Sequence, residues 1–389
     1  MTHPDHTPEI STRPADCLDV IVIGAGQAGL ALGWHLTQQQ ARYVIVDGAP
    51  ALGHSWRSRW DSLRLFSPAR YDSLPGMDFP ASADTYPTKD QVADYLAEYA
   101  ERFHLPVLLG HRVTRLTRDP DTKVFTVHTG HGPLRARQVV VATGPFQKPH
   151  LPELANGLNG QVTQVHSAHY RNPGQLPAGP VLVVGAGNSG LQIAEELATH
   201  PGPGGTAKRE VHLAVGATLP QLPQRLLGRD LFWWLTKTGA IYKPATSWVA
   251  RRMRARGDLV IGTSRARAAD LGVTLRPRVS TATGASVEFA DGSRLTPASI
   301  VWATGFVPDY TWIDVPDVIV DAAKPVDVRH ERGVTGTPGL YFLGLPWQHS
   351  RGSALLGFVR HDAAWLADHI RAHRPRAARG THAQQAVDL

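Results

Sequence analysis

Two glycine-rich loops have the residue types and the spacing that hold a dinucleotide pyrophosphate. Residues 24–29 read Gly-Ala-Gly-Gln-Ala-Gly, and residues 185–190 read Gly-Ala-Gly-Asn-Ser-Gly. In this pattern the first glycine permits a tight turn, the second lets the backbone approach the phosphates, and the third lets a helix pack closely on a strand. The phosphates then bind the N–H groups at the positive end of the helix. We therefore expect cofactor contacts from Gly24, Gly26, Gln27, Ala28, Gly29, Gly185, Gly187, Asn188, Ser189 and Gly190.

The segments around both loops supply the strand and the helix that the pattern requires. The β-branched runs at 19–23 and 181–184 are typical of strands buried on both faces, and helical patterns follow at 30–38 and 191–198. A second strand, 43–47, ends in Asp47, which is 47 − 24 = 23 positions after Gly24. A carboxylate at this distance binds a ribose diol, so the first loop is predicted to hold FAD.

The second unit lacks such an acid. Its matching strand, 210–216, continues into Ala217 and Thr218 without a carboxylate. A carboxylate there would repel a 2′-phosphate, so its absence favours NADPH over NADH at the second loop. No arginine directly follows the strand; Arg225 is the candidate for the phosphate, with Arg229 as the alternative.

Each loop is followed, at the same distance, by a strand that ends in Ala-Thr-Gly. The distance from Gly24 to Ala142 is 142 − 24 = 118 positions, and from Gly185 to Ala303 it is 303 − 185 = 118. One nucleotide-binding plan is therefore used twice, which indicates a flavin-dependent oxidoreductase that also binds a nicotinamide. We expect the residues after these strands, Thr143, Thr304 and Gly305, to lie beside the cofactors.

The repeat predicts an α/β protein of two Rossmann-like, three-layer (ββα) dinucleotide-binding domains, with the NAD(P)H domain inserted into the FAD domain. The FAD-binding domain is expected to consist of two chain segments, 18–168 and 299–375, with the NAD(P)H-binding domain between them at 169–298. Residues 1–17 and 376–389 are expected to be disordered tails.

Composition narrows the chemistry. Cys17 is the only cysteine, which excludes the redox-active cysteine pair of disulfide reductases and fits a reducing cytoplasm. The histidines show no metal spacing, so no metal site is expected. Apart from one arginine run at 251–256 the basic residues are scattered, and no nucleic-acid partner is expected. The apolar stretch 19–33 is too short to span a bilayer. The sequence thus predicts a soluble, cytoplasmic protein without an integral membrane segment.

Two surface features have alternative interpretations. The run Arg251, Arg252, Arg254 and Arg256 suggests a solvated helix face or, alternatively, a site for an anionic partner. The segment 222–250 is rich in aromatic residues, which indicate core packing or, alternatively, a hydrophobic entrance or a membrane-facing patch.

Beyond the loops, the chain resembles the single-component flavin monooxygenases from about residue 19 to about residue 370. The similarity is closest to a bacterial subgroup often labelled as putative potassium-transport flavoproteins. Besides the two loops, the motifs that support it are Gly53-His-Ser-Trp56, Pro87-Thr-Lys89, Pro149-His-Leu-Pro152, His166-Ser-Ala-His-Tyr170, Trp302-Ala-Thr-Gly-Phe306, Gly228-Arg-Asp-Leu-Phe-Trp-Trp234 and Gly339-Leu-Tyr-Phe-Leu-Gly344.

The resemblance implies an FAD- and NADPH-dependent monooxygenase that transfers one oxygen atom from O2 to a small, lipophilic substrate through a C4a-(hydro)peroxyflavin. It implies Gly53 and Trp56 near the flavin and Arg64 or Ser67 where drug-oxidising relatives carry an asparagine. His166 is either catalytic or a hinge residue of the interdomain linker. The same resemblance places Gly344 against the flavin ribityl chain or pyrophosphate, and places Ser353 in a segment, 350–353, that opens a last helix at 354–370.

Two other functions remain as alternatives at this point. One is a flavin NAD(P)H oxidase or reductase that forms no stable peroxyflavin. The other is a redox-sensing flavoprotein that regulates a partner such as an ion transporter. The substrate, the type of oxygenation and the oligomeric state, including a homodimer, stay open.

Overall fold

The computed structural model describes residues 17–200, 208–257, 259–321 and 327–374. Its first sheet contains five parallel strands. Most of their side chains are buried, and many are β-branched, as is typical of a parallel sheet that is covered on both faces. In spatial order these strands are β3 (Val107–Leu108), β2 (Tyr43–Val46), β1 (Leu18–Ile23), β6 (Gly132–Val141) and β22 (Leu340–Phe342). The strand β6 also continues into an extension made of β5 (Phe125–Thr129), β4 (Val113–Arg118) and β21 (Ile313–Asp314).

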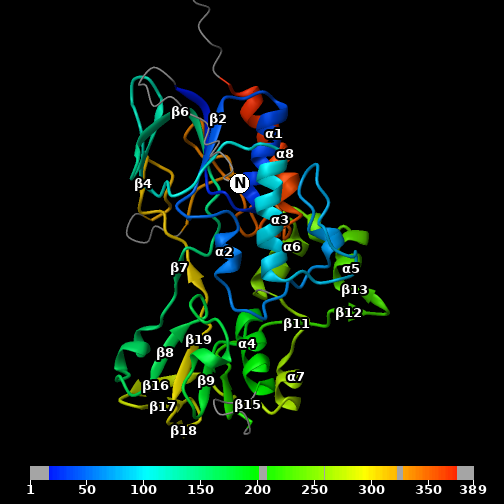
Figure 1. Ribbon diagram of the computed structural model, residues 1–389, viewed down its shortest axis with the longest axis vertical. Coiled ribbons are helices and arrows are strands. Elements are labelled where there is room, and N and C mark those ends of the chain that lie inside the picture. Colours follow the sequence, from blue (N-terminus) through cyan, green and yellow to red (C-terminus); the bar gives the residue numbers. More distant parts are fainter. Residues whose placement is uncertain (1–16, 201–207, 258, 322–326, 375–389) are drawn as a thin grey trace, which may run out of the picture.

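Three helices pack against one face of this sheet (Figure 1): α1 (Gln27–Gln38), α3 (Lys89–Arg102) and α8 (Val359–Ala372). The helix α3 starts at a capping box, in which the Thr88 hydroxyl accepts from the Gln91 N–H and the Gln91 amide accepts from the Thr88 N–H. The helices α1 and α8 pack side by side. Their buried side chains and those of the sheet form the largest apolar core of the described residues.

A second sheet repeats this plan. Its order is β15 (Thr274–Arg276), β10 (Val211–Ala214), β9 (Val181–Val184), β19 (Ser299–Trp302) and β8 (Thr163–His166), all parallel. The helices α4 (Asn188–Thr199) and α7 (Arg265–Asp270) and the antiparallel strands β16 (Val279–Thr283), β17 (Ser286–Phe289) and β18 (Arg294–Leu295) complete this domain. The predicted fold class, two Rossmann-like domains with the second inserted into the first, is confirmed.

The predicted boundaries at 168/169 and 298/299 do not agree with the sheets. The strands β8 and β19 were assigned to the FAD domain, yet both hydrogen-bond within the second sheet. The two sheets differ in the origin of one edge strand. In the first sheet this strand is β22, from the C-terminal region of the chain, and in the second it is β8, which precedes the glycine loop. The spacing between each glycine loop and its Ala-Thr-Gly strand does not show which strand outside that interval pairs with each sheet.

The last helix also differs from expectation. It begins at Val359 rather than at 354, so residues 350–353 do not open it. Ser353 is buried instead in the turn before the helix, where its Oγ accepts from the N–H groups of His349 (3.1 Å) and Ser350 (3.0 Å). These local bonds compete with the helix, as serine side chains commonly do.

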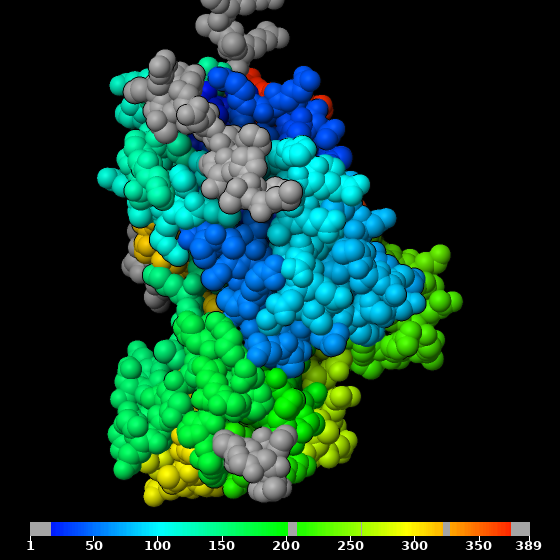
Figure 2. Space-filling view, viewed as in Figure 1, coloured from blue at the N-terminus to red at the C-terminus, as the bar shows by residue number. Residues whose placement is uncertain are grey.

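Two connections join the domains. On one side, β7 (Lys148–Pro149) pairs with β20 (Phe306–Val307) in antiparallel fashion. The segment that leaves the first domain and the segment that returns to it therefore run side by side. On the other side, residues 219–263 leave the second domain and pack beside the first, as the green lobe at the right of Figure 2 shows. This segment contains β11 (Gln221–Leu222), β12 (Arg225–Leu226), β13 (Arg229–Asp230), α5 (Leu231–Lys237), α6 (Trp248–Ala255) and β14 (Val260–Ile261).

Candidate functional site

The first glycine loop has the geometry that its sequence predicts. Gly24 has φ +111°, and a Cβ placed on it would lie 2.6 Å from the carbonyl oxygen of Ala142. A Cβ on Gly29 would overlap the carbonyl oxygen of Gly24, so only glycine allows α1 to pack this closely. Gly26, in contrast, has no atom within 4 Å of its Cβ position. This open space lies at the beginning of α1, where a pyrophosphate would bind.

The second loop has the same geometry. Gly185 has φ +110°, and a Cβ on it would overlap the carbonyl oxygen of Ala303, the counterpart of Ala142. A Cβ on Gly190 would overlap the oxygen of Gly185, while Gly187 faces open space. Neither Gly26 nor Gly187, the residues before α1 and α4, provides a side-chain cap. The N–H groups of both first turns are therefore left for a ligand.

Two predicted FAD contacts lie next to the first loop. Asp47 follows β2, and its carboxylate accepts from the N–H groups of Ala25 (2.7 Å) and Ala49 (2.8 Å). Each oxygen keeps a free lone pair that could accept from a ribose hydroxyl. Gly344 follows β22 with φ +84°, and a Cβ on it would lie 2.9 Å from the Ala28 side chain. The backbone at Gly344 thus approaches the start of α1.

One side chain of the second loop, that of Asn188, bonds within the protein. Asn188 donates to the carbonyl of Leu259 (2.9 Å) and accepts from the N–H of Ile261 (3.0 Å), which ties the second loop to β14. Gln27 and Ser189 lie half-buried in the first turns of α1 and α4.

The threonines of the two Ala-Thr-Gly strands also bond within the protein. The hydroxyl of Thr143 accepts from the Gln147 amide (2.8 Å), and that of Thr304 donates to the carbonyl of His150. Together with Gly305, which accepts from the His150 N–H, they organise the linkers between the domains.

An arginine that sequence reasoning missed lies at the end of β10. The Cγ of Arg278 is 3.9 Å from the Cβ position of Gly216, the place where a 2′-phosphate would need a cation. Arg225 lies elsewhere: it belongs to the β12–β13 hairpin, where its backbone is opposite Asp230, far from β15 in Figure 1. Arg278 reaches this place because β15, which ends two residues before it, pairs with β10. Only the pairing of these strands could have predicted its position.

His166 is held on both of its ring nitrogens. The N–H of Ala168 donates to Nδ1 (3.0 Å), so Nε2 carries the proton and donates to the carbonyl of Gly305 (3.0 Å). Burial lowers the pKa of this histidine, which keeps it neutral. Its ring also contacts Phe306 edge-on. The geometry is that of the hinge residue proposed as one alternative from the sequence, with no ring nitrogen left for proton transfer.

The two other catalytic candidates differ in burial. Arg64 is exposed and donates to the carbonyl of Tyr86 (3.3 Å). Ser67 is buried and its hydroxyl bonds to the Asp72 carboxyl at 2.6 Å. Burial raises the pKa of Asp72 to about 8, because no cation compensates a charge there. The pair therefore places an unusually basic carboxyl behind Ser67, and no sequence motif had indicated Asp72.

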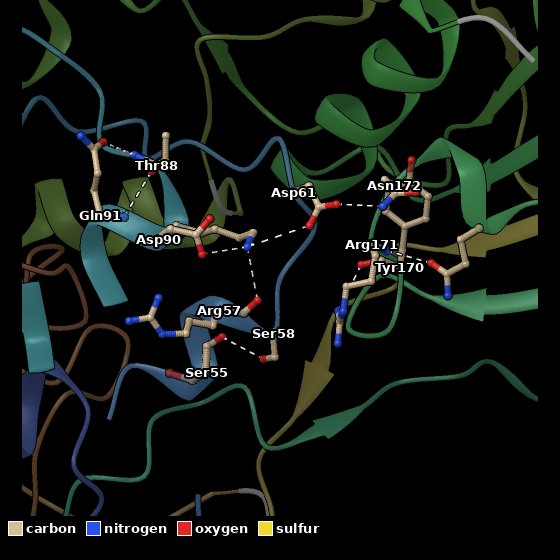
Figure 3. Close-up of polar contacts among 12 residues, drawn as sticks. Ser55, Arg57, Ser58, Asp61, Thr88, Asp90, Gln91, Tyr170, Arg171 and Asn172 are labelled. Carbon is tan, nitrogen blue, oxygen red and sulfur yellow. Dashed lines mark hydrogen bonds and ion pairs between the residues drawn. The ribbon is translucent and has the colours of Figure 1, made fainter. Parts of the chain in front are cut away.

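A polar cluster joins the domains beside the short helix α2 (His54–Arg57), as Figure 3 shows. Asp61 accepts from the Asn172 amide (2.8 Å) in the second domain, and buried Lys89 donates to Asp90 (2.9 Å) with its Nζ 4.0 Å from Asp61. Gly53 begins α2 with φ +70°, and its Cβ position is only 2.6 Å from Ala93 in α3. The motifs at 53–56 and 87–89 thus position the domain border, with Trp56 packed on the first core.

Replacing Asp72 by asparagine should make the free energy of unfolding less sensitive to pH between about 4 and 8. The unfolded pKa of an aspartate is about 3.9 and the folded value is about 8. Between these values the folded chain holds one more proton, so the free energy of unfolding falls as pH rises. Asp72→Asn has no such titration and keeps a hydrogen bond to Ser67. At about pH 9 it should exceed the wild type by at least about 1 kcal/mol, and at about pH 4 the gain should vanish.

Urea unfolding at the two pH values measures this difference, with the exposed Asp121→Asn as control. A pH response of Asp72→Asn equal to that of the wild type would show that Asp72 titrates normally.

Among the described residues, no three His, Cys, Asp or Glu side chains gather where they could hold a metal ion. No helix within the same residues is both long enough and apolar enough to cross a membrane.

Comparison with known proteins agrees with this geometry. Residues 21–205 match the family model described as pyridine nucleotide-disulphide oxidoreductase. A CzcO-like oxidoreductase of Geobacillus kaustophilus, itself uncharacterised, is 44% identical over 92% of this chain and 99% of its own length. A probable indole-3-pyruvate monooxygenase of Arabidopsis thaliana is 26% identical over 90% of this chain and 88% of its own.

Among solved structures, a flavin-containing monooxygenase from Stenotrophomonas maltophilia superposes with a TM-score of 0.74 at 28% identity. It covers 92% of this chain and 99% of its own. The single cysteine, Cys17, rules out the dithiol chemistry in the name of the matching family model. The resemblance found in the sequence is confirmed: this chain belongs to the CzcO-like oxidoreductases of the flavin monooxygenase-like family.

Proposed function

We propose that this protein is an FAD- and NADPH-dependent monooxygenase of a small, apolar substrate. The observation that carries the proposal is the matched pair of open cradles at Gly26 and Gly187, each before an uncapped helix. Asp47 beside the first cradle supports FAD there, and Arg278 beside the strand of the second supports NADPH. Bound flavin would accept hydride from the nicotinamide and deliver the electrons to O2.

The protein would supply binding and positioning to this chemistry. The N–H groups of α1 and α4 hold the two pyrophosphates, Gly344 lets the backbone approach the first cofactor, and His166 keeps the linkers in place. The resemblance implied Arg64 or Ser67 where drug-oxidising relatives carry an asparagine, and of the two Ser67 is the buried one. Its hydroxyl donates to the Asp72 carboxyl (2.6 Å), which fixes the orientation of the serine oxygen.

An apolar pocket supports the choice of substrate. It has a cavity volume of about 10 Å³, roughly what one water molecule needs, so it must widen to admit a substrate. Apart from Arg351 its lining is hydrophobic: Phe66, Phe232, Leu235, Ile241, Met253, Leu259, Ile261 and Leu355. Phe66 lines this pocket and directly precedes Ser67, which supports a substrate site beside the flavin.

Matched valine substitutions test the two cradles. Gly26→Val and Gly187→Val both add a side chain in open space, with backbone φ of −79° that valine tolerates, so both variants should fold. Gly26→Val should lose FAD affinity by about tenfold or more, because the side chain occupies the place of the pyrophosphate. Gly187→Val should stay yellow but be reduced by NADPH only at higher concentrations.

Flavin absorbance, circular dichroism and the rate of reduction by NADPH measure these effects. Full flavin content in Gly26→Val would refute the assignment of the first loop.

The role of Arg278 is tested by a comparison of coenzymes. Arg278→Ala removes one charge-assisted hydrogen bond to a 2′-phosphate, a contribution of about 1.5–3 kcal/mol. The KM for NADPH should therefore rise about 10- to 100-fold, and that for NADH should hardly change. Arg225→Ala, the residue expected from the sequence, is the matched control and should leave both KM values unchanged. Equal increases for NADPH and NADH in Arg278→Ala would mean that the residue does not bind the phosphate.

The monooxygenase reaction itself is tested with isotopic oxygen. The FAD-loaded enzyme is supplied with NADPH, ¹⁸O₂ and a panel of small sulfides, ketones and aromatic compounds, and the products are analysed by mass spectrometry. We expect one ¹⁸O atom in the product of at least one apolar compound, in amounts that match the NADPH consumed. Oxidation of NADPH with an equal amount of hydrogen peroxide, and no labelled product across the panel, would indicate an oxidase instead.

A further inference from the structure

The net positive charge of the chain is concentrated in one segment. The whole chain has 40 Lys and Arg against 33 Asp and Glu, a formal charge of 40 − 33 = +7. Residues 219–257 alone contain eight Lys and Arg and one Asp, which is 8 − 1 = +7. Asp258, the next residue, lowers this only to +6. All eight cations are exposed: Arg225, Arg229, Lys237, Lys243, Arg251, Arg252, Arg254 and Arg256.

The one acid inside this segment does not offset the surface charge. Asp230 is buried, and its carboxylate accepts from the Tyr86 hydroxyl (2.7 Å), the Gln224 amide (3.0 Å) and the N–H of Phe232 (2.7 Å). The bond from Tyr86 ties the segment to the first domain. Among residues 219–257 every exposed charged side chain is therefore a cation, and an anionic partner would meet no carboxylate of these residues.

The same segment carries four large exposed hydrophobic residues. Leu226 and Leu227, 49% and 82% exposed, form the tip of the β12–β13 hairpin, which projects at the right edge of Figure 1. Trp248 on α6 is 71% exposed and Tyr242 is 40% exposed. The aromatic residues of this region are therefore of two kinds. Phe232 is buried in an apolar core, whereas Trp248 and Tyr242 are exposed.

The helix α6 arranges these residue types on one side. At 100° per residue, Trp248, Arg251 and Arg252 share one face, and all three are exposed. Ala250 and Met253 face the protein, where Met253 lines the apolar pocket together with Leu235 of α5. Tryptophan is enriched at membrane–water interfaces, and arginines beside it are attracted to anionic headgroups.

We propose that residues 219–257, which we call the basic hairpin segment, dock on an anionic lipid surface. Arginines would attract the headgroups, while Leu226, Leu227 and Trp248 would enter the boundary of the acyl chains. A nucleic acid would satisfy the cations but would leave the aliphatic hairpin tip without a partner. A second copy of this face is disfavoured because two segments of charge +7 repel each other. Docking would bring the apolar pocket close to lipid. The entry of an apolar substrate from the lipid into this pocket would rest on the proposed function, whereas the docking itself does not.

Vesicle sedimentation with the full-length holoprotein tests the proposal. We expect binding to phosphatidylcholine vesicles that contain phosphatidylglycerol, little binding to pure phosphatidylcholine, and release at high salt. Arg251→Glu/Arg252→Glu should lower the partition coefficient by about tenfold or more. Leu226→Asp/Leu227→Asp should lower it by a similar factor, because it removes the apolar tip.

The matched control is Arg102→Glu/Arg135→Glu, which makes the same change in net charge at two exposed sites of the first domain. It should bind vesicles as the wild type does. Flavin content and reduction by NADPH serve as checks of folding for every variant. Three outcomes would overturn the proposal: no binding to anionic vesicles, an equal loss in the control, or binding to duplex DNA that is tighter than to vesicles and unaffected by Leu226→Asp/Leu227→Asp.

Discussion

A helix can present its first N–H groups to a pyrophosphate only if no side chain separates it from the turn before it. In this protein that constraint is met twice, by Gly29 against the carbonyl of Gly24 and by Gly190 against that of Gly185. The first glycine of each loop is pressed in turn against the end of an Ala-Thr-Gly strand. Each nucleotide site is therefore fixed by three segments that contact one another through backbone alone.

The same strand ends connect the two sites to each other. Thr304 and Gly305 continue the second Ala-Thr-Gly strand into the linker, where they bond to His150 and His166. On the opposite side, Asn188 of the second loop holds β14, and the segment that ends in β14 reaches the first domain through Gln224, which donates to the carbonyl of Phe66 (2.8 Å). Since Phe66 and Ile261 both line the apolar pocket, a change at the second loop can alter the pocket directly.

Local patterns predicted much of this architecture, because their causes are local. The glycine spacing, the strand before it and Asp47 all act within one continuous unit, and the 118-residue repeat showed that the unit occurs twice. Predictions failed where distant segments compete for one place. The fifth strand of each sheet, for example, could come from either flank. The start of α8 was wrong for a local reason, because the hydroxyl of Ser353 bonds to its own turn. Arg278 was missed because strand pairing, not sequence distance, brings it to Gly216.

Sequence patterns alone predict the two dinucleotide folds, the acid of the first site and the absence of a cysteine pair, since each depends on residue type at short range. The groups that remain available for chemistry were set by the tertiary structure. It bonded both nitrogens of His166 to backbone, placed Asp72 behind Ser67 in a buried setting, and spread the charge of residues 219–257 over an exposed lobe. Burial and the partners of a polar group are properties of the packed chain, and no local pattern records them.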